Sequence, residues 1–372
     1  MSEPVTATSP AGKAPRNLGI GSLLLIPLVA LLCLGEDTVV VGMALGVVQL
    51  LMSWTAGFLM FRRAWKYADA ARRRNIAVGV LLSLVGLAGA AVTLLTSLAT
   101  ALGGAWGRPL RVKGRQVHPE LREGADWTRG DRPDPAGLDA PTRRALEALW
   151  LHDAQKEHAS VPAFSRISWL LAAVGAPAEL MVGAHQAAME EIDHAQRCFA
   201  LAAGYGGRSH TVESMPDLLL GGMDLKGDPM VLLAVESLKD GCLLEDFNAD
   251  VAAECMAVCR EPATRGVLER ITLEERSHAE FSWDVLAFTL ARGGERVRRA
   301  VARALGELEH IQRPTAASTE KAALVEAADA AALLSHGRIP DAAWAACWVS
   351  RLESTRARAR ALLDAPGVQA AK

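Results

Sequence analysis

Long runs of apolar residues dominate the first third of this chain. Residues 18–35, 38–61 and 76–106 contain no charged side chain. Each run is long enough to cross about 30 Å of hydrocarbon as a helix. Because none of the runs has a polar face to turn toward water, we expect three transmembrane helices, the first two joined as a tight hairpin. The alternatives are buried core helices and, for the first run alone, a cleaved signal peptide.

From residue 141 onward, apolar positions recur at helical spacing and are interrupted by Pro and Gly. The pattern predicts four long helices, over 141–174, 177–204, 229–260 and 262–292. The first and third connections are short and the second is long, which is the connectivity of a four-helix bundle with one long crossover. Further helices are expected near 295–309, 317–335 and 341–364.

The chain is therefore expected to be all-α, with a membrane part followed by a helical bundle. The expected domains are a disordered tail over 1–17, three transmembrane helices over 18–106, a linker over 107–140, the bundle over 141–292 and a C-terminal helical extension over 293–372. The last helix carries several Arg on one face. We interpret them as a solvated face, with contact to anionic lipid or to the linker as the alternative.

The charge distribution gives no reason to expect a nucleic-acid partner. The 40 Lys and Arg nearly balance the 42 Asp and Glu, while 51% of residues are hydrophobic and the mean hydropathy is +0.16. Lys and Arg are more frequent in the N-terminal tail and the second loop than after the third apolar run. This weakly favours a cytoplasmic N-terminus and a C-terminal domain on the outer side. The cysteines include no C-x-x-C pair, and as buried thiols they mildly favour a reducing compartment instead.

One motif occurs twice in the expected bundle, 84 residues apart. It reads Glu-Glu-x-x-His-Ala at 190–195 and again at 274–279. Residues three apart share one face of a helix, so Glu191 with His194, and likewise the second pair, can each bind a metal ion from one side. A dinuclear carboxylate site then needs one further Glu from each of the two other helices.

Depth along each helix selects those two residues. The bridging Glu of the motifs lie 14 and 13 residues after their helix starts, and Glu157 and Glu245 each lie 16 residues after theirs. Glu236 would lie about 13 Å from the level of the others, at about 1.5 Å per residue. We therefore expect Glu245 to be the ligand and Glu236 to be exposed or an outer partner. Glu191 and Glu275 are expected to bridge two ions. The predicted metal ligands are Glu157, Glu191, His194, Glu245, Glu275 and His278.

The ligand types indicate which metals suit the site. Hard carboxylate oxygens with one imidazole per ion suit iron or manganese. Each neutral His should donate its second ring N–H to an outer acceptor. The sequence leaves that acceptor open among Asp153, Asp193, Glu190, Glu274 and an acid on a neighbouring helix. The remaining histidines are expected to lie away from the inner face of the bundle or in loops.

Several blocks of this chain resemble the ferritin-like di-iron superfamily. They lie at 157–164, 175–177, 191–195, 241–245 and 275–279. The chain looks most like a bacterial group of ferritin-like domain proteins, and the resemblance covers about residues 141–292. It implies a site that binds two iron ions and reacts with oxygen or peroxide. The only tyrosines, Tyr67 and Tyr205, are expected outside the bundle helices, which argues against a tyrosyl-radical role.

These observations predict a membrane-anchored di-iron oxidoreductase of the bacterial inner membrane that reacts with O2 or peroxide. Ferroxidase, peroxidase and oxygenase chemistry stay open, as does a manganese or mixed iron–manganese centre. The expected partners are the lipid bilayer, O2 or peroxide and an electron donor, without nucleic acid; a homo-oligomer is left open. The alternatives are a non-catalytic iron-binding or iron-sensing membrane module and a metal-free structural bundle.

Overall fold

The structure is a computed structural model that describes residues 108–112, 115–216, 218–219 and 227–365. All of these lie in one compact unit of the chain, Leu102–Lys372. The N-terminal tail and the three expected transmembrane helices lie outside the described residues. Within the described part, none of the helices combines the length and the apolar character needed to cross a membrane. This part is mostly helical, which confirms the all-α class for it.

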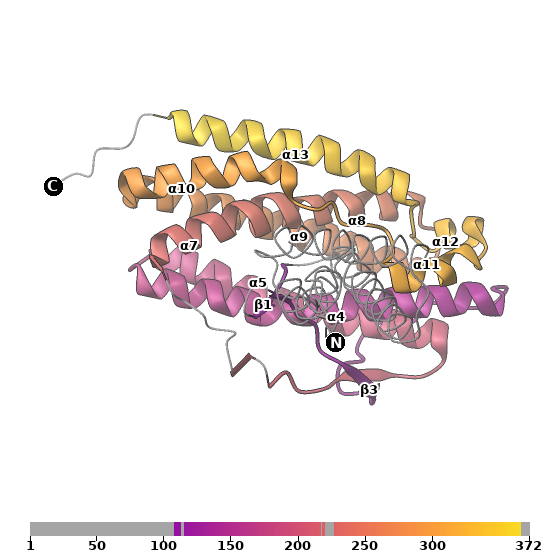
Figure 1. The fold of residues 1–372 in the computed structure, drawn as a ribbon. Helices are drawn as coiled ribbons and strands as arrows, with labels where there is room; N and C mark the ends of the chain where they lie inside the picture. Colours follow the sequence, from indigo (N-terminus) through magenta and orange to yellow (C-terminus); the bar gives the residue numbers. More distant parts are fainter. Residues whose placement is uncertain (1–107, 113–114, 217, 220–226, 366–372) are drawn as a thin grey trace, which may run out of the picture. The chain divides into compact units, whose positions relative to one another are not determined.

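Four long helical segments, which we call the bundle, form the centre of this unit (Figure 1). They are α4 (Ala140–Ala173), α5 (Ala178–Gly206), the consecutive helices α7 (Pro229–Glu236), η3 (Ser237–Glu245) and α8 (Asp246–Val258), and α9 (Pro262–Arg292). Short connections join α4 to α5 and α8 to α9, so each pair folds back on itself as a hairpin. Contacts of α5 with α9, and of α4 with α7, hold the two hairpins together.

The starts of three of these segments are fixed by acidic caps followed by proline. Asp139, Asp228 and Glu261 each accept backbone hydrogen bonds from the first turn of α4, α7 and α9. Such a cap satisfies N–H groups that lack partners inside the helix and stabilises a helix by about 1 kcal/mol. Proline lies in the first turn of all three helices, where its missing N–H costs nothing. The cap therefore sets the depth at which each later side chain lies.

The end of α5 corrects one expectation from the sequence. The helix continues through Gly204 and stops at Gly207, whose φ of 76° lies in the left-handed region. Gly204 serves a different purpose, because a Cβ there would overlap the ring of Pro133. Tyr205 consequently lies inside the last turn of α5, is 3% exposed, and its hydroxyl hydrogen-bonds with Thr264 and with the ring of His336, both at 2.8 Å. The prediction that Tyr205 lies outside the bundle helices is wrong.

The third segment of the bundle departs from regular α geometry in its middle. Residues Ser237–Glu245 form the π-helix η3 between two α-helices. A π-helix has more residues per turn, so it rotates the side chains that follow relative to a continuous α-helix. Gly241 in η3 lies against α9 so closely that a Cβ would overlap the hydroxyl of Ser282. The single helix expected over 229–260 is thus interrupted directly at the predicted ligand Glu245.

The bundle core is built from large apolar side chains on the inner faces of these segments. Trp150, Phe199, Leu238 and Phe247 are each at most 1% exposed and belong to one continuous cluster. Burying such a side chain contributes about 1.5–3 kcal/mol relative to leaving it exposed. The apolar layers lie along the same segments that carry the buried acids of the site, so packing holds those acids in position.

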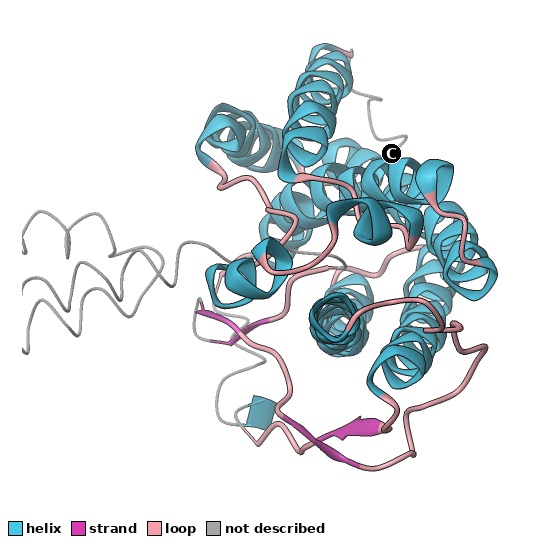
Figure 2. Cartoon of the chain, turned by 90° about the vertical axis from the view of Figure 1, so that its right-hand side faces the viewer, coloured by secondary structure: helices cyan, strands magenta, loops and turns pink. Residues whose placement is uncertain are grey.

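The segment expected as a linker packs on the bundle wherever it is described. Its strands are short: β1 (Arg111–Val112) pairs with β2 (Arg115–Gln116), and β3 (Leu121–Glu123) pairs with β4 (His210–Val212), both antiparallel. Figure 2 shows these strands lying outside the helices. Leu110 is 2% exposed and Arg108 is 3% exposed, so the first described residues of this segment are buried.

The C-terminal helices cover one side of the bundle (Figure 1). They are α10 (Gly294–Glu307), the 3-10 turn η4 (Leu308–His310), α11 (Thr319–Glu326), α12 (Ala330–Ser335) and α13 (Asp341–Asp364). The single helix expected over 317–335 is split, because Asp329 caps a new helix at Ala330. The expected solvated face of the last helix is also corrected. Three of its Arg pair with bundle or neighbouring acids: Arg351 with Asp246 and Asp250, Arg356 with Glu309, and Arg358 with Glu280.

Candidate metal centre

The six predicted ligands come together in the interior of the bundle. Their ligand atoms form two overlapping groups, and within each group all atoms lie within 4.8 Å of one another. The first group is Glu157, Glu191, His194 and Glu275; the second is Glu191, Glu245, Glu275 and His278. We call these the His194 subsite and the His278 subsite. Glu191 and Glu275 belong to both, which is the arrangement expected of bridging carboxylates.

Each side chain reaches the centre from a different part of the bundle. Glu157 comes from α4, the first motif from α5, Glu245 from the last position of η3, and the second motif from α9. The i, i+3 spacing of each motif places its carboxylate and its imidazole on one helix face. All six side chains are buried, with exposures of 0–1%.

Glu236 occupies a separate position, as expected for a residue that is not a ligand. Its carboxylate forms an ion pair with Arg166 of α4 at 2.6 Å, and its side chain is 24% exposed. Glu245, in contrast, lies at the end of η3 and is 0% exposed. The choice of Glu245 over Glu236 therefore agrees with the positions of both carboxylates.

The ligand atoms of the six residues have no hydrogen-bond partner among the described residues. This holds for both oxygens of all four Glu and for Nδ1 of both His. Buried polar atoms are nearly always hydrogen-bonded, because leaving them unpaired costs about 1–3 kcal/mol each. The closest approaches are Nδ1 of His278 to Glu191 at 3.3 Å and Nδ1 of His194 to Glu157 at 3.7 Å. Ligand atoms about 2.0–2.2 Å from a common ion lie about 3–4 Å from one another, so these separations suit metal coordination.

Burial and crowding of like charges perturb the four carboxylates. Burial, followed by the charge of Glu191, raises the pKa of Glu157 well above its ordinary value. Burial, followed by the charge of Glu245, does the same to the pKa of Glu275, and burial also raises the pKa of Glu245. At Glu191 burial acts upward as well, but both imidazoles outweigh it and hold the pKa below its ordinary value. Without a cation, the site therefore retains protons on its acids.

The imidazoles are perturbed in the complementary direction. Burial alone would lower both values, but the surrounding acids outweigh it. The pKa of His278 rises to about 9 under the influence of Glu190 and Glu191, and the pKa of His194 is raised well above its ordinary value. Imidazoles and carboxylates must lose protons to bind a metal, so occupation of this centre would release protons.

The outer acceptors of the two imidazoles cross between the repeats. Nε2 of His194 lies 2.8 Å from Oε2 of Glu274, and Nε2 of His278 lies 2.8 Å from Oε2 of Glu190. The first Glu of each Glu-Glu pair thus orients the His of the other motif and leaves Nδ1 facing the centre. Of the other candidates, Asp193 pairs with Arg197 and Asp153 with Arg338. The repeat of a second Glu in both motifs was the sequence signal for this role.

Two buried cations near the centre were missed from the sequence. Arg108 hydrogen-bonds Ser282 at 3.4 Å and the carbonyl of Glu236 at 3.2 Å, and its charge acts against the effect of burial at Glu245. Lys156, the neighbour of Glu157, is 3% exposed, and burial lowers its pKa to about 8. No periodic or motif signal marks either residue, because each is defined by what packs around it.

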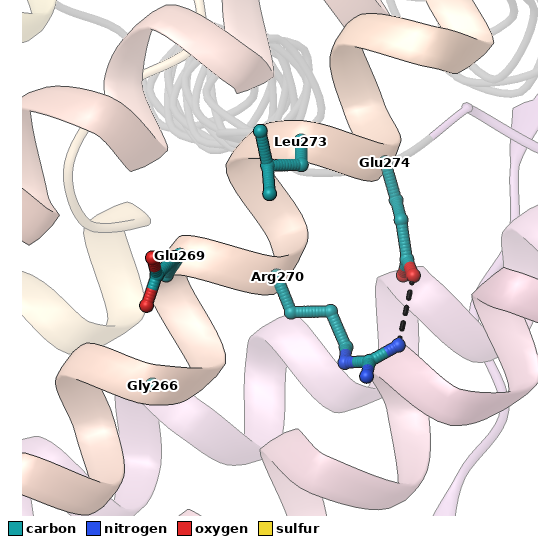
Figure 3. Close-up of a pocket in the computed structure, with 5 residues that line it drawn as sticks. All are labelled: Gly266, Glu269, Arg270, Leu273 and Glu274. Atoms are coloured by element: carbon teal, nitrogen blue, oxygen red, sulfur yellow. Dashed lines mark hydrogen bonds and ion pairs between the residues drawn. The ribbon is translucent and has the colours of Figure 1, made fainter.

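A shallow surface pocket lies on the outer side of α9. It has a volume of about 340 Å³ and is lined by Gly266, Glu269, Arg270, Leu273 and Glu274. Figure 3 shows Arg270 reaching toward Glu274, with which it forms an ion pair at 2.9 Å. A second pocket, of about 520 Å³, lies between the β2–β3 connection and residues 213–218. None of the six ligands lines either pocket.

Comparisons with protein-family models, with curated proteins and with solved structures gave no match to this chain. The functional argument therefore rests on the cluster itself. A buried group of four carboxylates and two imidazoles, with all of its inward-facing atoms unpaired, could hold a metal ion.

Proposed function

We propose that this chain is a membrane-anchored ferritin-like protein whose bundle binds two iron ions and acts as an oxidoreductase toward O2 or peroxide. The observation that carries the proposal is the double group of unpaired ligand atoms that shares Glu191 and Glu275. The hairpin–crossover–hairpin order of the bundle and the blocks that resemble the ferritin-like superfamily support the same reading. The membrane anchor rests on the apolar runs within residues 18–106.

Charge balance favours two divalent ions. Four ionised Glu carry four negative charges, and two divalent cations with two neutral imidazoles cancel them. A single divalent ion would leave two negative charges in a fully buried site, which is costly. The oxygen-rich ligand set with one imidazole per ion favours iron or manganese over softer metals.

Iron bound in such a centre supplies electrons to O2 or peroxide, and the protein residues determine what can reach it. The ligands are almost completely buried, and neither surface pocket is lined by one of them. Small reactants fit this enclosure better than a large organic substrate. Glu274 and Glu190 hold the two imidazoles in one orientation, so the inward Nδ1 atoms stay available for the metal.

The proposal is tested on the purified full-length protein. Metal-free protein is loaded anaerobically with Fe²⁺ and analysed for iron, and consumption of O2 and of peroxide is then measured. We expect about two irons per chain and uptake of oxidant. Absence of bound iron would contradict the whole proposal. Two bound irons without any oxidant uptake would instead support the second candidate, an iron-binding or iron-sensing module, which the same closed site would also suit.

A further inference from the structure

The two motif-bearing helices match position by position beyond the ligands. Five residues before each bridging Glu stands a polar residue, Gln186 in α5 and Arg270 in α9. Each one donates to the Glu four residues further along its own helix: Gln186 to Oε1 of Glu190 at 2.6 Å and Arg270 to Oε1 of Glu274 at 2.9 Å. The two repeats therefore place equivalent side chains behind equivalent outer carboxylates, but one side chain is neutral and the other is a cation.

These contacts extend into two chains that end on opposite subsites. One runs from Gln186 through Glu190 to Nε2 of His278, and the other from Arg270 through Glu274 to Nε2 of His194. In Figure 3 the guanidinium of Arg270 points directly at the carboxylate of Glu274. Arg270 also approaches Asp193 at 3.7 Å, and Asp193 in turn pairs with Arg197 at 2.6 Å. Around Glu274, two acids are therefore balanced by two Arg.

The difference in charge changes how strongly each outer Glu polarises its imidazole. A carboxylate that accepts the distal N–H of a ligating His increases the basicity of that His toward the metal. Glu190 bonds only a neutral amide on its other oxygen, so its full negative charge acts on His278. The charge of Glu274 is largely compensated by Arg270. His278 is consequently the stronger donor of the two.

The ligand sets themselves do not cancel this difference. Each subsite contains one imidazole, one terminal Glu and both bridging Glu. Each also has one buried cation near its terminal Glu: the charge of Lys156 interacts with Glu157, and that of Arg108 with Glu245. The main imbalance between the two halves lies in the pair Gln186 and Arg270.

We infer that the two subsites bind metal unequally: the His278 subsite fills first and holds its ion more tightly, and the cation at Arg270 sets the difference. The inference rests on the proposed two-ion function. Changing an outer partner of a ligating His typically alters metal affinity 10–100-fold. Because Arg270 modifies such a partner and does not remove it, we expect the two dissociation constants to differ by about tenfold.

The order of filling is tested by titrating the metal-free full-length protein anaerobically with Fe²⁺ against a competing chelator. The wild type should show two steps. Glu157→Ala, which removes the terminal ligand of the His194 subsite, should keep the tighter step, whereas Glu245→Ala should lose it. If Glu245→Ala keeps the tighter step, or if both steps are equal in the wild type, the inference is overturned while a two-iron function stands. If the wild type binds no Fe²⁺, the proposed function fails first.

The role of the outer charge is tested with a matched exchange. Arg270→Gln should strengthen the weaker step and bring the two constants together, and Gln186→Arg should do the same by weakening the tighter step. The double exchange Gln186→Arg with Arg270→Gln should reverse the order of filling, read out by combining it with Glu157→Ala. Gln186 is exposed on α5, so its variant keeps the inference falsifiable even if Arg270→Gln does not fold. Unchanged spacing of the two steps in Gln186→Arg would refute the role of the outer charge.

Discussion

Glu245 and Glu236 lie nine positions apart in the same segment of the bundle and form a matched pair for mutagenesis. Glu245 is a fully buried member of the His278 subsite, whereas Glu236 pairs with Arg166 outside it. We expect Glu245→Ala to lower the iron content by about one ion per chain and to remove the tighter step. Glu236→Ala should retain both ions, because it breaks only a partly exposed ion pair. Metal analysis after anaerobic loading measures both; equal loss in the two variants would show that Glu245 is not a ligand.

The pH dependence of stability follows from the perturbed ligands. Burial raises the pKa of Glu157, Glu245 and Glu275, and the nearby acids raise the pKa of His278 to about 9. In each case the metal-free folded state binds more protons than the unfolded state, so its free energy of unfolding falls as pH rises through this range. The lowered pKa of Glu191 acts only below the ordinary carboxyl range.

We therefore expect the thermal midpoint of the metal-free protein to fall between pH 6 and pH 9. The metal-loaded protein should lack this fall, since bound cations replace the protons. Glu275→Gln, which removes one ionisable ligand, should flatten the dependence in the metal-free state. A midpoint that rises over this interval would contradict the assignment of raised pKa values in the centre.

The six ligands could be predicted at this scale because regular helices convert sequence spacing into depth and direction. Capped starts fix the level of Glu157 and of both motifs, and the i, i+3 spacing fixes which side chains share a face. The outer partners could not be chosen beforehand, because Glu190 and Glu274 bond the His of the other repeat across two helices. Arg108 and Lys156 were missed for the same reason: their environment is made by segments distant in sequence.

The π-helix η3 is the element whose geometry most directly places a ligand. Gly241 permits η3 to approach α9, because a Cβ at this position would overlap Ser282. We expect Gly241→Ala to destabilise the protein by about 1–3 kcal/mol through overpacking and to weaken iron binding by shifting Glu245. Gly266→Ala is the control: it lies inside α9 with open space around the added methyl, and should stabilise the helix by about 0.5–1 kcal/mol. Thermal unfolding and iron content of both variants test this; a neutral Gly241→Ala would show that the close approach is not required.

Element boundaries and irregularities were the least predictable feature of the fold. The π-helix has no marker in the hydrophobic pattern, since its apolar positions also fit a continuous helix over 229–260. The end of α5 was misplaced because Gly204 resembles a helix stop, yet it serves close packing against Pro133. Tyr205 was therefore assigned to a loop, although it is buried in α5 and bonded to His336.

Docking of α13 joins the C-terminal extension to the bundle through charge. Arg351 holds Asp250 at 2.7 Å and also contacts Asp246, the neighbour of Glu245, and Arg276 of α9 shares both acids. We expect Arg351→Met to destabilise the protein by about 2 kcal/mol, because Arg276 then balances two partly buried acids alone. The control Arg360→Met, at an exposed position on α13, should change stability by less than about 0.5 kcal/mol. Equal midpoints for the two variants would show that α13 does not depend on this contact.

At the scale of the whole molecule, the proposed anchoring rests on the three uncharged runs, which lie outside the described residues. Each run exceeds the length needed to span the hydrocarbon, so the full chain should remain with membranes after washing at high pH. A reporter that is active only on the outer side, fused at the C-terminus, should be active, because Lys and Arg are concentrated in the tail and the second loop. Replacing Arg72, Arg73 and Arg74 with Asn should reduce that activity by weakening the charge bias. Release of the wild type by the wash would refute the anchor, and a silent outer reporter on retained protein would place the metal centre on the cytoplasmic side.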